Sequence, residues 1–175
     1  MMQLLEAGGM EVLTDGTRIA DPDNPKGYYE WEPMKGAARN PELFGSVALC
    51  GKAIKCVSML LPSLPVEHTY KVIFMMRPIR EVAASQAEML RRSGRTGMAV
   101  FDLHNLEAQL LKHRDRTLAW LRKAANFEVM ELDYPSLVTR PNETIPRIVK
   151  FAGAELLPTA AKMSSVIDPS LHRKR

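Results

Sequence analysis

The chain has 175 residues, of which 46% are hydrophobic and 25% are charged, and this composition excludes a disordered chain and a repeat array. Its formal net charge is +4, and the basic residues are scattered apart from the C-terminal stretch "HRKR", so small anions suit it better as partners than nucleic acid. The two cysteines, Cys50 and Cys56, have neither zinc-ribbon nor redox spacing. Apolar stretches stay well below the ~20 residues that span a bilayer. We therefore expect a cytoplasmic protein without metal or membrane function.

The first part of the chain alternates short elements with loops. The stretch "MQLLEAGG" has the apolar spacing of a helix end, and its two glycines are typical of a helix C-cap. The elements expected up to residue 69 are, in order, a helix that ends at Gly8 and Gly9, a strand at 10–13, a loop at 14–27, short helices at 34–39 and 41–44, a strand at 52–58 and an apolar turn at 59–65.

The second part begins with a strand that changes directly into a helix. Residues 72–76 are five consecutive apolar residues, which predict a strand buried on both faces, and Arg77 and Pro78 follow at once. From Ile79 onward the apolar spacing is helical. The elements expected afterwards are a break at 93–97, a long helix at 100–125, a strand at 127–132, a helix at 141–153 and an irregular tail.

Strands that alternate with helices and read as continuous apolar runs predict an α/β fold with a parallel sheet. Ligands of such sheets bind beyond the carboxyl ends of the strands, and Lys55, Arg77, Asp133 and Tyr134 all fall at or near such ends. Ser85 follows Arg77 by eight residues and offers a hydroxyl donor for a bound anion. The alternative is that Arg77 pairs with a surface carboxylate and Ser85 only packs among small neighbours.

Two segments resemble the nucleotide-binding parts of sulfotransferases that use 3'-phosphoadenosine-5'-phosphosulfate (PAPS). "RPIREVAASQ" resembles their 3'-phosphate segment, R-N-x-x-D-x-x-x-S, with Pro78 and Glu81 in place of the usual Asn and Asp. The resemblance implies that Arg77 and Ser85 bind that phosphate. "LDYPSLVTRPNETIPRIVKFAG" resembles the Y-E-D-L-x-x-x-P segment and places Tyr134 on the tyrosine that contacts the adenine in cytosolic members.

Two further segments resemble the parts of these enzymes that act on the sulfuryl group and the acceptor. "IKCVSMLLPSLP" is similar to the K-T-H-L-P region and places Lys55 near the transferring group, although Cys56 and Val57 replace the Thr and His. "NPKGYYEWE" resembles a loop that supplies a glutamate in bacterial members, so Glu30 or Glu32 is the candidate base in place of the histidine. The alternative is that both glutamates are solvated acids in an aromatic loop, without a catalytic role.

The resemblance implies a single domain over residues 1–175, with a mostly parallel sheet in a three-layer α/β/α arrangement of the P-loop NTPase type. The implied reaction transfers a sulfuryl group from PAPS to a hydroxyl or amine of a small-molecule, sugar or peptide acceptor. The family's P-x-S-G-[ST]-[ST] loop does not occur in the sequence, so we expect an N-terminally incomplete domain with impaired activity, whose exposed strand edges favour a homodimer. The alternatives are a non-catalytic module that binds adenosine 3',5'-bisphosphate, and a nucleotide-kinase-like P-loop protein.

Overall fold

The computed structural model describes residues 1–20, 24, 26–37, 39, 41–44, 49–92 and 103–168. The chain divides into two compact units, which are described separately below. Unit 1 comprises Met1–Thr69 and Pro141–Ile167, and unit 2 comprises Tyr70–Arg140 and Asp168–Arg175. The predicted break at 93–97 and the basic stretch "HRKR" lie outside the described residues.

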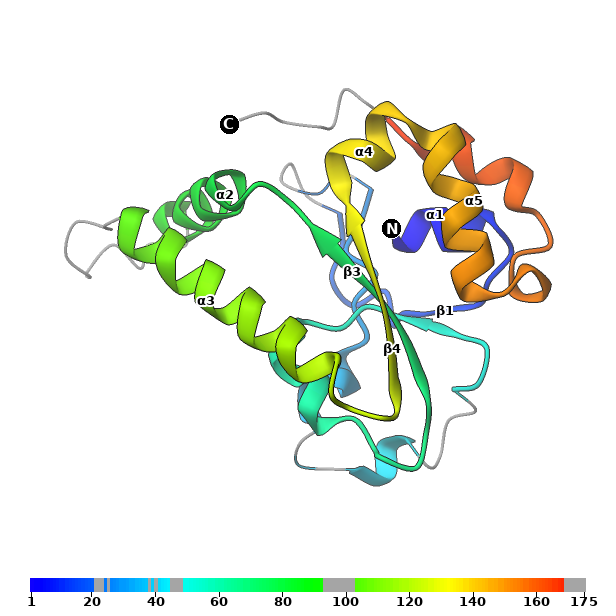
Figure 1. Cartoon of the computed structure of the whole chain (residues 1–175), viewed down its shortest axis with the longest axis horizontal. Coiled ribbons are helices and arrows are strands. Elements are labelled where there is room, and N and C mark those ends of the chain that lie inside the picture. Colours follow the sequence, from blue (N-terminus) through cyan, green and yellow to red (C-terminus); the bar gives the residue numbers. More distant parts are fainter. Residues whose placement is uncertain are drawn as a thin grey trace. The chain divides into compact units, whose positions relative to one another are not determined.

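Unit 1 consists mainly of short elements (Figure 1). They are α1 (Met2–Ala7), β1 (Val12–Leu13), β2 (Ala53–Ile54), α5 (Pro141–Ala152) and the 3-10 helices η1 (Glu32–Gly36), η2 (Pro41–Phe44), η3 (Ser58–Ser63), η4 (Ala154–Leu156) and η5 (Ala160–Val166). The predicted helix end is confirmed, since Gly8 caps α1 and Gly9 has a φ of 97°. The predicted strands at 10–13 and 52–58 are shorter than expected. Only two residues of each predicted segment form a strand, and the two strands pair in a parallel ladder with Val12 beside Ala53.

Two groups of contacts hold unit 1 together. Met34, Ala37 and Phe44 form a buried cluster, and the Trp31 ring packs edge-on against Phe44 at 6.2 Å between centroids. In the second group, α1 packs against η5, and the Thr159 amide donates to the Gly8 carbonyl at 2.9 Å. A Cβ added at Gly8 would lie 2.5 Å from a methyl of Leu157, so a larger residue there would force the Leu157 side chain to move.

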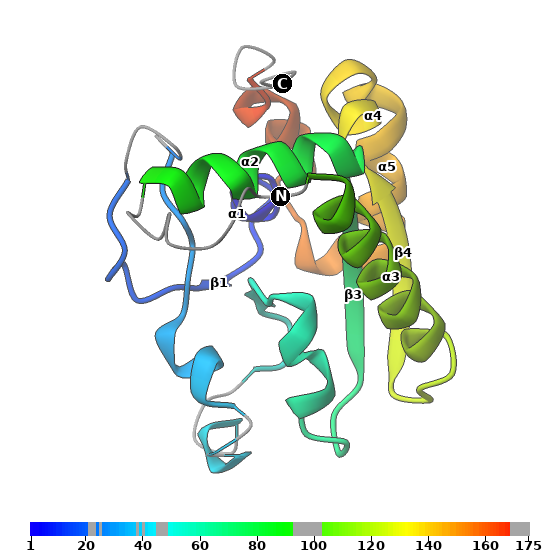
Figure 2. The same ribbon diagram turned by 90° about the vertical axis from the view of Figure 1, so that its left-hand side faces the viewer.

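Unit 2 is built on a ladder of two parallel strands. β3 (Tyr70–Met76) pairs with β4 (Phe127–Asp133) over their whole length, from Tyr70 beside Phe127 to Met76 beside Asp133. Helices α2 (Ile79–Arg92) and α3 (Leu103–Leu121) lie on the same side of this ladder, as Figures 1 and 2 show, and α3 buries Leu118 and Leu121. A short helix, α4 (Tyr134–Thr139), follows β4 directly.

The structure corrects three expectations for unit 2. Residues 72–76 form the predicted strand, but their side chains are half-buried and not fully buried, because β3 and β4 form a ladder of two strands among the described residues. The long helix ends at Leu121, four residues before the predicted end at residue 125, and residues 100–102 of the predicted range lie outside the described residues. Helix α4 was not anticipated, because its six residues are too few to show a helical period.

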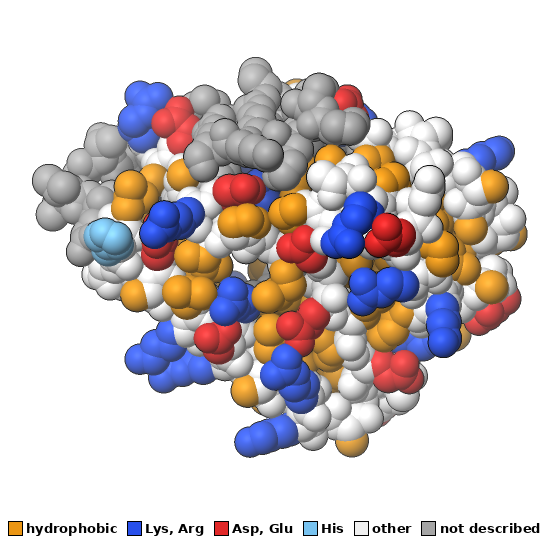
Figure 3. Space-filling view, turned by 45° about the horizontal axis from the view of Figure 1, so that its top comes forward, with side chains coloured by type: hydrophobic (Ala, Val, Ile, Leu, Met, Phe, Trp, Pro, Cys, Tyr) orange, Lys and Arg blue, Asp and Glu red, His pale blue; other side chains and the backbone are white. Residues whose placement is uncertain are grey.

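The parallel ladders and the helices confirm an α/β protein at the level of fold class. Within the described residues, we find no helix with the length and apolarity needed to cross a membrane. On the face drawn in Figure 3, Lys and Arg side chains are interspersed with Asp and Glu side chains, in line with the scattered charges of the sequence.

Candidate functional site

Lys55 follows β2 directly, and residues of a unit 1 loop hold its ammonium group. The Nζ atom donates to the Tyr28 carbonyl at 2.8 Å and lies 5.5 Å from the centroid of the Tyr28 ring. It also lies 3.6 Å from Oε1 of Glu30. With 37% of its side chain exposed, Lys55 is a restrained cation at the end of a strand, in the place that the sequence predicted.

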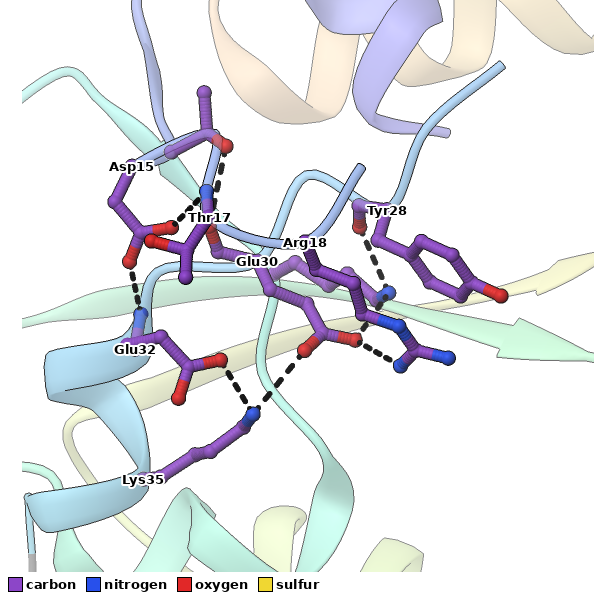
Figure 4. Close-up of polar contacts among 9 residues, drawn as sticks. Asp15, Thr17, Arg18, Tyr28, Glu30, Glu32 and Lys35 are labelled. Atoms are coloured by element: carbon purple, nitrogen blue, oxygen red, sulfur yellow. Dashed lines mark hydrogen bonds and ion pairs between the residues drawn. The ribbon is translucent and has the colours of Figure 1, made fainter. Parts of the chain in front are cut away.

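Glu30 is the centre of an ion-pair cluster, and its side chain is only 17% exposed (Figure 4). Its carboxylate accepts from Arg18 Nη1 at 3.0 Å and lies 3.3 Å from Lys35 Nζ, in addition to the contact with Lys55. Burial works to raise the pKa of Glu30. The hydrogen bond from Lys35 and the charges of Lys55 and Arg18 outweigh burial, so the pKa lies below its ordinary value. Glu30 is therefore a stable anion and a weak proton acceptor.

Glu32 shares Lys35 with Glu30, because Lys35 Nζ also donates to Glu32 Oε1 at 2.5 Å. The Glu32 backbone is held by Asp15, whose Oδ2 accepts from the Glu32 amide at 2.6 Å and whose Oδ1 accepts from the Thr17 amide at 2.9 Å (Figure 4). These two backbone hydrogen bonds lower the pKa of Asp15. Asp15 therefore connects the loop that carries Arg18 to the start of η1.

Arg77 follows β3 in unit 2 and has two partners. Its Nη2 lies 3.2 Å from Glu81 Oε2, one turn into α2, and its guanidinium carbon lies 5.0 Å from the centroid of the Tyr134 ring. The Nε atom is buried and has no hydrogen-bond partner among the described residues. An unpaired buried donor on a cation is costly, so this atom is a ready donor for an anionic ligand.

Tyr134 and Ser85 are placed by the ladder and by α2. Because Met76 pairs with Asp133, the next residues, Arg77 and Tyr134, leave the two strands at the same end. Ser85 is exposed and lies one turn beyond Glu81, so both lie on the same face of α2. The alternative stated for Arg77 holds in one respect, since it does pair with a carboxylate, but that carboxylate comes from the adjoining helix.

Sequence reasoning named Lys55, Glu30 and Glu32, which unit 1 brings into one cluster, but it missed Arg18 and Lys35. Lys35 was detectable, because it stands three residues after Glu32 at a helical spacing. Arg18 was not, because it lies in an irregular loop whose partners no periodicity indicates.

A family model described as "Sulfotransferase domain" matches residues 55–170, which is more than half of the chain. The matched range contains Lys55, Arg77, Ser85 and Tyr134 and begins after Glu30 and Glu32. Neither the curated proteins nor the solved structures gave a match. On the strength of this match, the chain belongs to the sulfotransferase domain family.

Proposed function

We propose that the chain transfers a sulfuryl group from PAPS to a hydroxyl or amine of an acceptor. Membership of the sulfotransferase domain family supports sulfuryl transfer in general. The donor and the roles of individual residues are our assignments, and the contacts within each unit support them.

In unit 2, we assign Arg77 and Ser85 to the 3'-phosphate of the donor and Tyr134 to its adenine. The observation that carries this assignment is the buried and unpaired Nε of Arg77, which lies at the carboxyl end of β3. A phosphate oxygen would satisfy this donor with a charge-assisted hydrogen bond. The guanidinium carbon lies 5.0 Å from the centroid of the Tyr134 ring, so an aromatic surface adjoins the proposed phosphate site.

In unit 1, we assign Lys55 to the transfer step. The acceptor atom forms a bond to sulfur while the bond from sulfur to the oxygen of the 5'-phosphate breaks, and the products are the sulfated acceptor and adenosine 3',5'-bisphosphate. Negative charge accumulates on the leaving oxygen during this step. A cation that is already held in place lowers the barrier, because it needs no reorganisation when the charge develops. The Tyr28 carbonyl restrains Lys55 in this way.

A carboxylate takes the acceptor's proton, and the ion pairs favour Glu32 over Glu30 for this role. Glu30 lies near three cations that stabilise its ionised form, and its pKa is lowered. A base that binds a proton so weakly is poorly matched to general base catalysis near neutral pH. We therefore assign Glu32 as the base and Glu30 as the residue that positions Lys55.

The test is calorimetric titration of the protein with adenosine 3',5'-bisphosphate. Arg77→Ala is expected to weaken binding by about 1.5 to 3 kcal/mol, because a charge-assisted hydrogen bond to phosphate is lost. Arg91→Ala is the matched control, since Arg91 lies on the same helix, is exposed and pairs with Glu88. Equal affinities of the wild type and Arg77→Ala would overturn the assignment.

Two further measurements separate the alternatives. Binding of adenosine 3',5'-bisphosphate without any transfer of sulfate from PAPS would indicate a binding module instead of an enzyme. Tighter binding of ATP with magnesium than of adenosine 3',5'-bisphosphate would indicate a kinase-like protein.

A further inference from the structure

Tyr29 lies between the two residues that hold the Lys55 ammonium group. The Tyr28 carbonyl accepts from Lys55 Nζ at 2.8 Å, and Oε1 of Glu30 lies 3.6 Å from the same nitrogen. The backbone angles of Tyr29 therefore set the direction of the Tyr28 carbonyl relative to Glu30. None of the assignments above gives Tyr29 a role.

The backbone of Tyr29 has an unusual conformation. Its φ is 52°, and the other positive φ angles in the described part of the chain belong to glycines. This left-handed region is unfavourable for a bulky residue. A return of φ to the ordinary negative range would rotate the Tyr28 carbonyl by roughly 110° or more about the N–Cα bond of Tyr29. The carbonyl and the Glu30 carboxylate would then no longer converge on one ammonium group.

The residues on both sides of Tyr29 are fixed by further contacts with the preceding loop (Figure 4). The guanidinium carbon of Arg18 lies 3.4 Å from the centroid of the Tyr28 ring. The Glu30 carbonyl accepts from the Asp15 amide at 3.2 Å. Because both neighbours are held, the turn at Tyr29 has to span the angle between them.

The Tyr29 side chain anchors this turn to α1. Its hydroxyl donates to Oε2 of Glu6, near the end of that helix. Burial and this hydrogen bond raise the pKa of Tyr29 to about 12, so the phenol remains a donor at neutral pH. The hydrogen bond offsets the unfavourable φ, and it allows a tyrosine at a position that otherwise suits glycine or asparagine.

We propose that Tyr29 is a positioning residue for Lys55. Its left-handed backbone turns the Tyr28 carbonyl and the Glu30 carboxylate toward the same ammonium group, and its phenol holds that backbone in place through Glu6. The role rests on the proposed function, because Lys55 is the cation assigned to sulfuryl transfer. It assigns the preorganisation of that cation to a residue that need not touch the donor or the acceptor.

The test is competitive acetylation of the lysines of the full chain with acetic anhydride, measured by mass spectrometry. The contacts of Lys55 slow its acetylation, and the exposed Lys71 on β3 is the internal reference in every sample. Loss of the alignment is expected to raise the Lys55 rate relative to Lys71 by about fivefold, the factor that one lost hydrogen bond allows.

Three substitutions at residue 29 separate the backbone from the side chain. Tyr29→Val removes the phenol and resists a positive φ, because valine is β-branched. Tyr29→Phe keeps the ring and loses the hydrogen bond to Glu6. Tyr29→Asn also lacks the phenol, but asparagine tolerates the left-handed conformation. We expect faster Lys55 acetylation in Tyr29→Val and Tyr29→Phe, and the protection of the wild type in Tyr29→Asn.

Lys52 is the matched control within unit 1. It also pairs with a carboxylate, that of Glu11, and this contact does not involve residues 28–30. Acetylation of Lys52 should therefore be the same in the wild type and in all three variants. A rise at both Lys52 and Lys55 would overturn the proposal, because Tyr29 would then support the fold of unit 1 and not the position of one lysine.

Two other results would overturn the proposal: unchanged acetylation of Lys55 in Tyr29→Val, or equal rises in Tyr29→Val and Tyr29→Asn. The proposed function has a separate readout, the release of adenosine 3',5'-bisphosphate from PAPS. In Tyr29→Val, kcat for this release should fall and the KM for PAPS should not change, because Lys55 acts on charge that develops during transfer. A wild type that releases no adenosine 3',5'-bisphosphate would overturn the proposed function, while the acetylation pattern still decides the role of Tyr29.

Discussion

Glu30 gathers cations from three separate positions of the chain, and this determines what its carboxylate can do. Arg18, Lys35 and Lys55 all lie within 3.6 Å of its oxygens. A glutamate in an aromatic loop was a natural candidate for the base in the sequence, but its surroundings stabilise the charged form. Its main effect is to restrain neighbouring cations, and we expect that effect to appear in stability measurements.

Glu30→Gln is expected to lower the free energy of unfolding by about 1 kcal/mol at neutral pH, because partly exposed ion pairs are individually weak. The pKa of Glu30 is lowered in the folded state, so its contribution is present above its ordinary pKa of 4.5 and is lost as the pH falls through the folded value. The difference from the wild type should therefore shrink in acid. Urea denaturation at neutral and at acidic pH measures both values.

The exposed Glu67 provides the control for this comparison. Glu67→Gln should change the free energy of unfolding little at either pH. A difference between wild type and Glu30→Gln that stays constant down to strongly acidic pH would show that the three contacts do not depend on the charge of Glu30.

Helix α4 shows how a single side chain sets the boundary of an element. Asp133 is the last residue of β4 and also the N-cap of α4, where its Oδ2 accepts from the Ser136 amide at 2.8 Å and from the Ser136 hydroxyl at 2.6 Å. Pro135 sits in the first turn, where its missing N–H removes no helical hydrogen bond. The cap therefore fixes the point at which Tyr134 turns out of the ladder.

Asp133→Ala is expected to lower the free energy of unfolding by about 1 kcal/mol, which is the usual cost of losing an N-cap side chain. Asp133→Asn keeps an oxygen acceptor in the same place and should retain most of the stability. Thermal or urea denaturation of the two variants measures the difference. Equal losses would mean that the charge of Asp133, and not its capping hydrogen bond, stabilises this region.

Across the whole molecule, much apolar surface remains exposed. The apolar residues 72–76 of β3 are half-buried, and each described ladder has two strands. In unit 1, Val57, Met59 and Val66 are 59%, 76% and 77% exposed. Exposed strand edges and large exposed apolar side chains both favour association with another chain.

We therefore propose that the chain forms a homodimer, and sedimentation velocity over a range of concentrations tests this. The weight-average mass is expected to rise with concentration toward twice the monomer mass. Met59→Glu should shift the equilibrium toward the monomer, because it places a charge in the exposed apolar surface. Gln109→Glu is the control, because it adds a charge at an exposed position that is not apolar. A constant monomer mass would contradict the proposal.

The sequence was sufficient to predict features that depend on neighbours along the chain. The change from a strand to a helix around Arg77 was predicted by apolar spacing, and the helix end at Gly8 was predicted by its glycines, since both signals are local. Family motifs, which are also local, were sufficient to select Lys55, Arg77, Ser85 and Tyr134 as candidates.

Only the tertiary structure decided which distant groups meet. The contacts of Glu30 with Arg18 and Lys55 join irregular segments, and α1 packs against η5, which lies close to the other end of the chain in sequence. No spacing along the chain encodes such contacts. They arise because folding brings segments together to bury apolar surface, and that burial fixes which charged and polar groups become neighbours.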